Sequence, residues 1–183
     1  MKIGIISDTH GSLTAWRNAY AFIKDADLIV HCGDVLYHGP RNPLPDGYQP
    51  RELAEELNAV STPLLFAKGN CDAEIDQLLL DYPLESPYVH LVTPDFKILF
   101  HHGHLFAPDS LPAKIARNYQ IVVSGHTHLP GIQRFGAVIT LNPGSPALPK
   151  NEPRIPTVAM IRDREIQIFD IQRGTLLMNT PIE

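Results

Sequence analysis

The sequence has few cysteines, no surplus of positive charge and no long apolar run at its start. Only two of its 183 residues are cysteines, Cys32 and Cys71, which excludes a framework of disulfide bonds. The formal net charge of -5 argues against nucleic acid as a partner, because binding a phosphate backbone normally requires clustered lysines and arginines. The first apolar run, Ile3–Ile6, is too short for a signal-peptide core or a membrane span. We therefore expect no membrane partner and a cytoplasmic location.

The chain also lacks internal repeats, low-complexity segments and shifts in composition that would mark a domain boundary. A length of 183 residues suits one domain, since domains commonly have about 100–200 residues. We therefore expect a single domain over residues 1–183. In contrast, the sequence is rich in two residue types, with 17 prolines and 9 histidines. The prolines imply many loops around a scaffold, and the histidines suit metal ligation.

The first part of the chain alternates between short apolar runs and helical repeats. Leu13, Trp16 and Tyr20 recur at helical spacing after the first apolar run. A second helix is expected to begin at Pro50, which suits the first turn. Asp72 is a candidate cap for a further short helix through Leu79. The apolar runs themselves are predicted to be buried strands, at residues 3–6, 28–30 and 64–67.

The later part of the chain is dominated by predicted strands. A brief helix candidate at residues 111–117 interrupts them, and helical patterns disappear from Gly131 onward. With βα units first and antiparallel strands last, the fold class is α/β with α+β layering. The predicted strands lie at residues 89–92, 97–100, 121–124, 132–135, 137–141, 157–161 and 165–171.

Five of the predicted strands are followed by side chains that commonly bind metals. Residues two apart in an extended chain point the same way, so Asp8 and His10 could share one metal. Taken alone, the shorter motifs also fit ordinary turn chemistry, and Asp8 could simply cap the next helix. The histidine clusters have no comparable packing explanation. The five motifs are Asp8-Thr9-His10, Gly33-Asp34, Gly69-Asn70-Cys71-Asp72, His101-His102-Gly103-His104 and Gly125-His126-Thr127-His128.

The shared position of the five motifs favours a common metal site. Open α/β sheets gather their ligands outside the carboxyl ends of their strands, where all five motifs fall. Two further histidines are interpreted differently, because His101 should point away from its neighbour by strand alternation and His31 lies within a strand end. We interpret the segment Asn142-Pro143-Gly144-Ser145 as a turn that packs beneath the metal loops.

In their order, the motifs resemble those of the calcineurin-like metallophosphoesterase superfamily, whose signature runs Asp-x-His, Gly-Asp, Gly-Asn-His-Asp or Glu, His, and Gly-His-x-His. The resemblance covers essentially the whole chain. It implies a metallophosphoesterase-like sandwich of two mixed β-sheets flanked by helices. Further segments are similar to those of the small bacterial YfcE-type phosphodiesterases, namely His38-Gly39-Pro40-Arg41-Asn42, His102-Gly103-His104-Leu105-Phe106 and Asn142-Pro143-Gly144-Ser145.

The resemblance also implies a site for two divalent metal ions per chain. Because imidazole and amide ligands are neutral, two aspartates leave such a pair of ions with a positive surplus that attracts phosphate. A hydroxide that bridges the ions would attack phosphorus in line. Manganese is the expected metal, with zinc, iron and nickel as alternatives. When the ligands of the superfamily are matched to this sequence, the resemblance implies that one ion is held by Asp8, His10 and His128 and the other by Asn70, His102 and His126, with Asp34 bridging them.

One position departs from the superfamily signature. Cys71 stands where the family has a histidine that assists the leaving group, next to the catalytic Asn70, and a thiol is a poor proton donor in that role. His104 could supply the proton or orient substrate, or it could only support the metal loop. In the proline-rich loop after the bridging aspartate, Arg41 and His38 could contact a phosphate oxygen, or be a solvated loop residue and a turn cap.

Hydrolysis of a small phosphodiester is the function that the resemblance implies. The same dinuclear site could hydrolyse a phosphomonoester, and the sequence barely separates the two reactions. A different class of function is a protein-binding scaffold, because the retromer subunit Vps29 has a similar fold. The complete set of implied ligands argues against the scaffold. The expected partners are a small phosphoester and further copies of the chain, as a homodimer or homotetramer.

Overall fold

Short apolar segments form the parallel centre of a seven-stranded sheet in the computed structural model, which describes residues 1–106, 115 and 117–183. The parallel strands are β1 (Ile3–Ile6), β2 (Leu28–His31), β3 (Leu64–Ala67) and β4 (Leu84–Glu85). The first three are buried almost throughout, as continuous apolar runs covered on both faces should be. Antiparallel strands extend the sheet beyond β1, namely β10 (Thr157–Arg162), β11 (Glu165–Asp170) and β12 (Thr175–Pro181).

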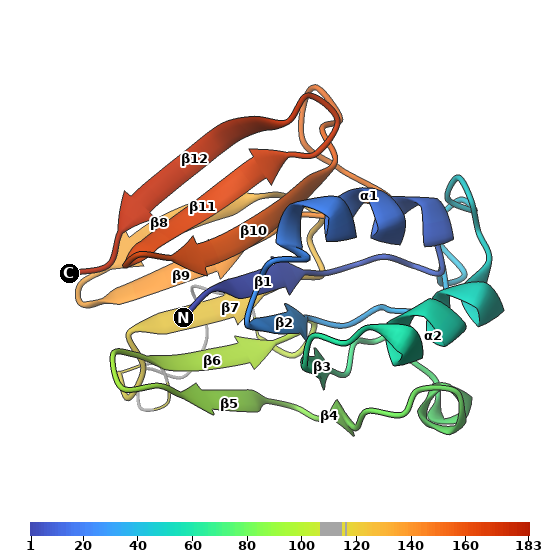
Figure 1. Cartoon of the computed structure of the whole chain (residues 1–183), viewed down its shortest axis with the longest axis horizontal. Coiled ribbons are helices and arrows are strands. Elements are labelled where there is room, and N and C mark those ends of the chain that lie inside the picture. The colour runs from blue at the N-terminus through green and yellow to red at the C-terminus, as the bar shows by residue number, and fades with distance from the viewer. Residues whose placement is uncertain (107–114, 116) are drawn as a thin grey trace.

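Two helices cover one face of this sheet (Figure 1). Helix α1 (Leu13–Ile23) begins at Ser12, whose hydroxyl accepts a hydrogen bond from the backbone N–H of Ala15, and helix α2 (Pro50–Ala59) begins at the proline. Trp16 of α1 packs in one apolar cluster with the outer face of the sheet. The helical repeats predicted from the sequence therefore correspond to the helices that shield the parallel strands.

A second, five-stranded sheet packs against the other face (Figure 1). Strands β6, β7 and β9 are parallel, and β5 and β8 close the edges antiparallel. One buried apolar cluster contains Ile5 and Val30 from the first sheet together with Phe100 and Val123 from the second. The predicted sandwich of two mixed sheets is confirmed. The strands are β5 (Val89–Val92), β6 (Lys97–His101), β7 (Ile121–Ser124), β8 (Gly131–Phe135) and β9 (Val138–Asn142).

Three local features do not match the sequence predictions: one predicted helix cap is wrong, an exposed edge strand was not predicted, and one helix candidate falls almost wholly outside the described residues. Asp72 does not cap the short helix, since η1 (Glu74–Leu78) begins at Ala73 and the carboxylate of Asp76 accepts the backbone N–H of Ala73. Strand β12 has no predicted counterpart, because it is an exposed edge strand whose pattern shows no buried face. The helix candidate at 111–117 lies almost entirely outside the described residues. Within the part of the chain that is described, neither α1 nor α2 has the length and apolarity to cross a membrane.

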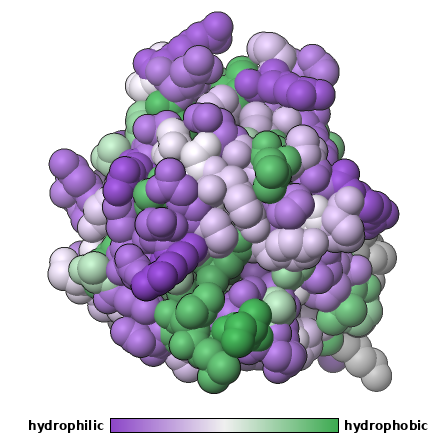
Figure 2. Space-filling view, turned by 90° about the vertical axis from the view of Figure 1, so that its right-hand side faces the viewer, coloured by the Kyte–Doolittle hydropathy of each residue, from purple (hydrophilic) through white to green (hydrophobic). Residues whose placement is uncertain are grey.

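The parallel strands of both sheets end at the same side of the sandwich, the right-hand side in Figure 1. The five motifs of the sequence follow β1, β2, β3, β6 and β7, so all of them lie at this edge. Figure 2 views this face, which is mostly hydrophilic with one hydrophobic patch near its lower end. Because strands from both sheets end here, residues far apart in the sequence meet at the junction between the sheets.

Packing between the two sheets should contribute much of the free energy of unfolding. Phe100 is fully buried between the sheets, and Phe100→Ala should lower the free energy of unfolding by about 3–5 kcal/mol, through lost burial and the cavity left behind. The control Leu176→Ala on β12, where the side chain is 47% exposed, should change it by about 0.5 kcal/mol or less. Urea unfolding monitored by circular dichroism measures both, and similar losses for the two variants would contradict this packing.

Candidate metal centre

Two groups of metal-binding side chains lie at the junction between the sheets, and each draws on both sheets. The first joins Asp8 and His10, after β1, to His128, after β7. The second joins Asp34, after β2, to His102 and His126, after β6 and β7. The potential ligand atoms of each group lie within 4.8 Å of one another. The packing of the two sheets therefore completes both groups.

The first group is arranged so that its nitrogen lone pairs face each other. The Nδ1 atoms of His10 and His128 lie 2.9 and 2.6 Å from the carbonyl oxygens of Tyr37 and Leu148, so each Nδ1 carries the proton. The two Nε2 atoms therefore face each other and are only 3.2 Å apart. Asp8 Oδ1 lies 3.6 and 3.3 Å from them, and it is buried without a hydrogen bond.

In the second group, a histidine is again oriented by a backbone carbonyl oxygen. His102 Nδ1 donates to the carbonyl oxygen of Cys32 at 2.8 Å, which leaves its Nε2 facing Asn70 Oδ1 at 3.2 Å and Asp34 Oδ2 at 3.3 Å. The amide of Asn70 is turned with its Nδ2 toward Cys71 Sγ at 3.3 Å, so its oxygen points to the histidine. Asn70, predicted as a ligand, thus lies with this group.

Asp34 lies between the two groups. Its Oδ1 accepts a hydrogen bond from the backbone N–H of Cys71 at 2.8 Å. Its Oδ2 is 3.3 Å from His102 Nε2 and 3.8 Å from His10 Nε2, one histidine of each group. One carboxylate oxygen is therefore tied to the protein, and the other faces both groups, which is the arrangement that a bridging ligand needs.

These acceptors fit a pair of cations better than any arrangement of neutral groups. A buried carboxylate oxygen without a donor and two facing imidazole lone pairs are costly unless positive charge lies among them. The pKa of His102 shows the same preference for positive charge, whereas burial lowers the pKa values of His10 and His126. Burial lowers the pKa of His102, but Asp34 and Asp8 outweigh it and raise this pKa to about 9. Oxygen and imidazole donors suit first-row divalent metals.

The backbone at these residues is strained. Asp8, His10, Asp34, His126 and His128 all have positive φ, between 48° and 68°, where side chains other than glycine are disfavoured. Each such residue costs on the order of 1–3 kcal/mol, and such strain concentrates at functional sites. These backbone conformations direct the side chains of each loop toward the junction between the sheets.

Two buried polar residues hold the strained loops in place. His31 donates from Nε2 to the Thr9 hydroxyl at 2.9 Å, and its Nδ1 accepts the backbone N–H of Gly33 at 3.2 Å, so it links the loops after β1 and β2. The Thr9 hydroxyl donates in turn to the carbonyl oxygen of Val35. Asp72 accepts backbone N–H groups of Asp34, Val35 and Gly69 at 2.6–2.8 Å and links the loops after β2 and β3.

The segment from Asn142 to Ser145 makes the corresponding ties on the second sheet. Asn142 Nδ2 donates to the carbonyl oxygen of Gly125 and to the Thr127 hydroxyl, at 2.8 and 3.0 Å. Ser145 Oγ donates to the carbonyl oxygen of Asp8 at 2.8 Å. A turn that the sequence analysis placed beneath the metal loops thus connects the loop after β1 with the loop after β7.

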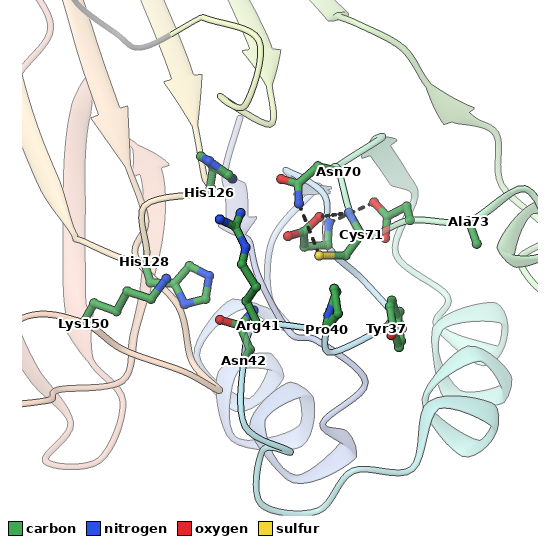
Figure 3. A pocket seen from close by; sticks show the side chains of 13 residues that line it. Tyr37, Pro40, Arg41, Asn42, Asn70, Cys71, Ala73, His126, His128 and Lys150 are labelled. Carbon is green, nitrogen blue, oxygen red and sulfur yellow. Dashed lines mark hydrogen bonds between the residues drawn. The ribbon is translucent and has the colours of Figure 1, made fainter.

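A cavity of about 780 Å³ opens above the two groups (Figure 3). Asp34, Asn70, His126 and His128 line its floor, and the loop around Arg41 and the side chain of Lys150 form its rim. Cys71 also faces the cavity. Burial and the neighbouring Asp34 raise the pKa of its thiol to about 12, which disfavours the nucleophilic thiolate.

The other residues singled out in the sequence take varied positions. His104 is exposed, and its ring centroid lies 5.4 Å from that of His102 and 6.3 Å from that of His126. His38 is not among the described residues that line the cavity, and its ring packs edge-on against Tyr37 and Tyr48. Lys150 had no signal in the sequence, because no motif precedes it and only the fold brings it to the cavity.

Comparisons with known proteins agree with this arrangement. The calcineurin-like phosphoesterase superfamily domain matches residues 1–164. Phosphodiesterase YfcE of Escherichia coli K12 is 42% identical over 152 residues, which are 82% of each chain. The solved structure of YfcE, a phosphoesterase from E. coli, has a TM-score of 0.91 at 35% identity and covers 100% of both chains. Vps29 from Chaetomium thermophilum, at 14% identity and a TM-score of 0.69 over 100% of both chains, shares the fold.

The link made by His31 should be measurable as metal affinity. His31→Phe keeps an aromatic ring beside Phe66 but removes both hydrogen bonds to the loops, so affinity for Mn²⁺ should fall about 10–100-fold. The matched control His90→Phe changes a histidine of β5 that contacts Tyr119, away from the loops. Isothermal titration calorimetry gives both affinities. Equal Mn²⁺ binding by the two folded variants would show that His31 does not position the site.

Proposed function

Because this chain belongs to the calcineurin-like phosphoesterase superfamily, we propose that its two acceptor groups each hold a divalent cation and that it hydrolyses a small phosphodiester at this site. The observation that carries the proposal is the position of Asp34 Oδ2, which faces His10 of one group and His102 of the other. A single cation would leave one of the two groups with its lone pairs opposed.

In the proposed site, Asp8, His10 and His128 bind one cation, Asn70, His102 and His126 bind the other, and Asp34 bridges them. When bound, the two cations supply an activated water and positive charge for the phosphoryl oxygens. The protein fixes the ligands, because His10, His102 and His128 each donate from Nδ1 to a backbone carbonyl oxygen and present only Nε2. Imidazole, carboxylate and amide ligands suit Mn²⁺, with Zn²⁺, Fe²⁺ and Ni²⁺ as alternatives.

The departing oxygen needs stabilisation from a residue other than Cys71. A thiol whose pKa is raised to about 12 gives up its proton poorly at neutral pH. Arg41 lines the same cavity, and its side chain reaches toward His126 (Figure 3). We assign Arg41 to the phosphoryl group, to which a guanidinium donates two hydrogen bonds. His104 is exposed beside His102 and stands at the edge of this arrangement.

Asp34→Asn should abolish metal-stimulated hydrolysis while the fold is retained. The substitution keeps the shape of the side chain but removes the charge shared between the two groups, so turnover with Mn²⁺ should fall more than about 100-fold. The control Asp95→Asn removes an exposed carboxylate that pairs with Arg164 in another part of the molecule. Turnover of an aryl phosphodiester, with circular dichroism for the fold, tests both. Full activity of Asp34→Asn would contradict the dinuclear assignment.

Metal removal should separate the chemistry from the fold. Treatment with a chelator should abolish hydrolysis of bis(p-nitrophenyl) phosphate, and Mn²⁺ should restore it, because the acceptor groups remain assembled by the protein's own hydrogen bonds. The matching monoester, p-nitrophenyl phosphate, should turn over more slowly. Activity confined to the monoester would replace the proposed diesterase by a monoesterase, and activity that survives complete metal removal would contradict the metal site itself.

A further inference from the structure

Two cationic side chains at the rim of the cavity have no acidic partner. Arg41 and Lys150 are both exposed and both line the cavity. In the described part of the chain, neither side chain forms an ion pair or a hydrogen bond. The lysines and arginines that do form ion pairs there are Arg17, Arg51, Lys68, Arg164 and Arg173. The two rim cations are therefore available to a ligand.

The backbone at Lys150 is fixed to the metal loops. The N–H of Lys150 donates to the carbonyl oxygen of His128 at 3.2 Å, and His128 Nδ1 donates back to the carbonyl oxygen of Leu148 at 2.6 Å. The Ser145 hydroxyl accepts the backbone N–H of Leu148 at 2.9 Å and donates to the carbonyl oxygen of Asp8 at 2.8 Å. Lys150 is thus held at a defined place beside the first acceptor group, which distinguishes it from an ordinary surface lysine.

The two cations occupy different parts of the cavity (Figure 3). Arg41 reaches toward His126, on the side of Asn70 and Cys71. The resemblance to the superfamily, in which the residue at the position of Cys71 assists the leaving group, implies that the leaving group departs on this side. Lys150 extends toward His128, on the opposite side of the view from Cys71. An anion that contacts Lys150 would therefore belong to the part of the substrate that lies away from the leaving group.

The charge within the cavity exceeds what one phosphodiester can neutralise. In the proposed site, two divalent cations would bring four positive charges, which Asp8, Asp34, Asp72 and a hydroxide formed from the activated water would reduce to zero, and Arg41 and Lys150 would raise this to two. A phosphodiester carries a single negative charge at its phosphoryl group. The surplus is local, since the whole chain has a formal net charge of -5. A positive cavity in an acidic protein selects ligands with more than one negative charge.

We propose that Lys150 is a specificity residue that binds a second anionic group, a carboxylate or a phosphate, on the retained side of the phosphodiester. This inference rests on the proposed function and narrows its substrate class to phosphodiesters with an additional negative charge. Arg41 serves the reacting phosphoryl group, and Lys150 serves the substituent, so the two cations have separate tasks. Lys150 touches no ligand atom of the acceptor groups through its side chain, and its loss should leave metal binding unchanged.

Two matched esters test the inference. 2-Carbamoylethyl p-nitrophenyl phosphate and 2-carboxyethyl p-nitrophenyl phosphate have the same leaving group and substituents of nearly the same size, and they differ by one negative charge. With Mn²⁺, the wild-type protein should hydrolyse the carboxyethyl phosphodiester with a kcat/KM about tenfold higher than that of the uncharged analogue, and added salt should weaken this preference. Lys150→Met should abolish this preference by raising the KM for the carboxyethyl phosphodiester alone, with kcat and Mn²⁺ affinity unchanged. Lys150→Arg should retain most of it, and the control Lys97→Met all of it.

The outcomes separate the inference from the proposed function. Hydrolysis of both esters with equal kcat/KM by the wild-type protein, or an undiminished preference in Lys150→Met, would overturn the role of Lys150 and leave the phosphodiesterase in place. Failure of the wild-type protein with Mn²⁺ to hydrolyse either ester would overturn the proposed function, and the inference with it. A fall in Mn²⁺ affinity in Lys150→Met would show that Lys150 acts on the metal loops and would likewise overturn the specificity role.

Discussion

The mutual repulsion of oxygen and nitrogen lone pairs at the junction of the two sheets is the constraint on which this structure depends. His10 and His128 bring their Nε2 atoms to 3.2 Å from each other, and Asp8 Oδ1 is buried beside them without a hydrogen bond. Such a cluster is stable only with positive charge in its midst. The raised pKa of His102 expresses the same demand from the second group. The proposed pair of cations would meet this demand and supply the chemistry of phosphoester hydrolysis.

The loops that gather these acceptors are held against their own backbone preferences. Five of the residues in the two groups have positive φ, a backbone conformation that is costly for residues other than glycine. Buried hydrogen bonds from His31, Asp72, Asn142 and Ser145 offset this strain by linking each loop to its neighbour. The polar residues beneath the site thus have a function that is separate from ligation, since they keep the lone pairs converging.

In the proposed site, the two sides of the cavity bind different parts of the substrate. Arg41 reaches toward the histidine nearest the Asn70 and Cys71 turn, and Lys150 is held beside His128 by the same hydrogen bonds that orient that histidine. With the proposed cations bound, the cavity of this acidic chain would be positive and would concentrate anions where the ligands converge. The raised pKa of the Cys71 thiol makes it a poor proton donor to a departing oxygen, and in the proposed site Arg41 binds the phosphoryl group.

The sequence by itself determined the strands, the two long helices and the motifs at the strand ends, because apolar runs, helical spacing and metal-binding residue types are local properties. The edge strands β4 and β12 were not predicted, since β4 has only two residues and the exposed residues of β12 have no pattern of burial. Only the tertiary structure decided which imidazole nitrogens are free, why Asp72 ties loops instead of capping η1, and how Lys150 reaches the cavity. These features depend on contacts between segments far apart in the chain, which form when the two sheets pack together.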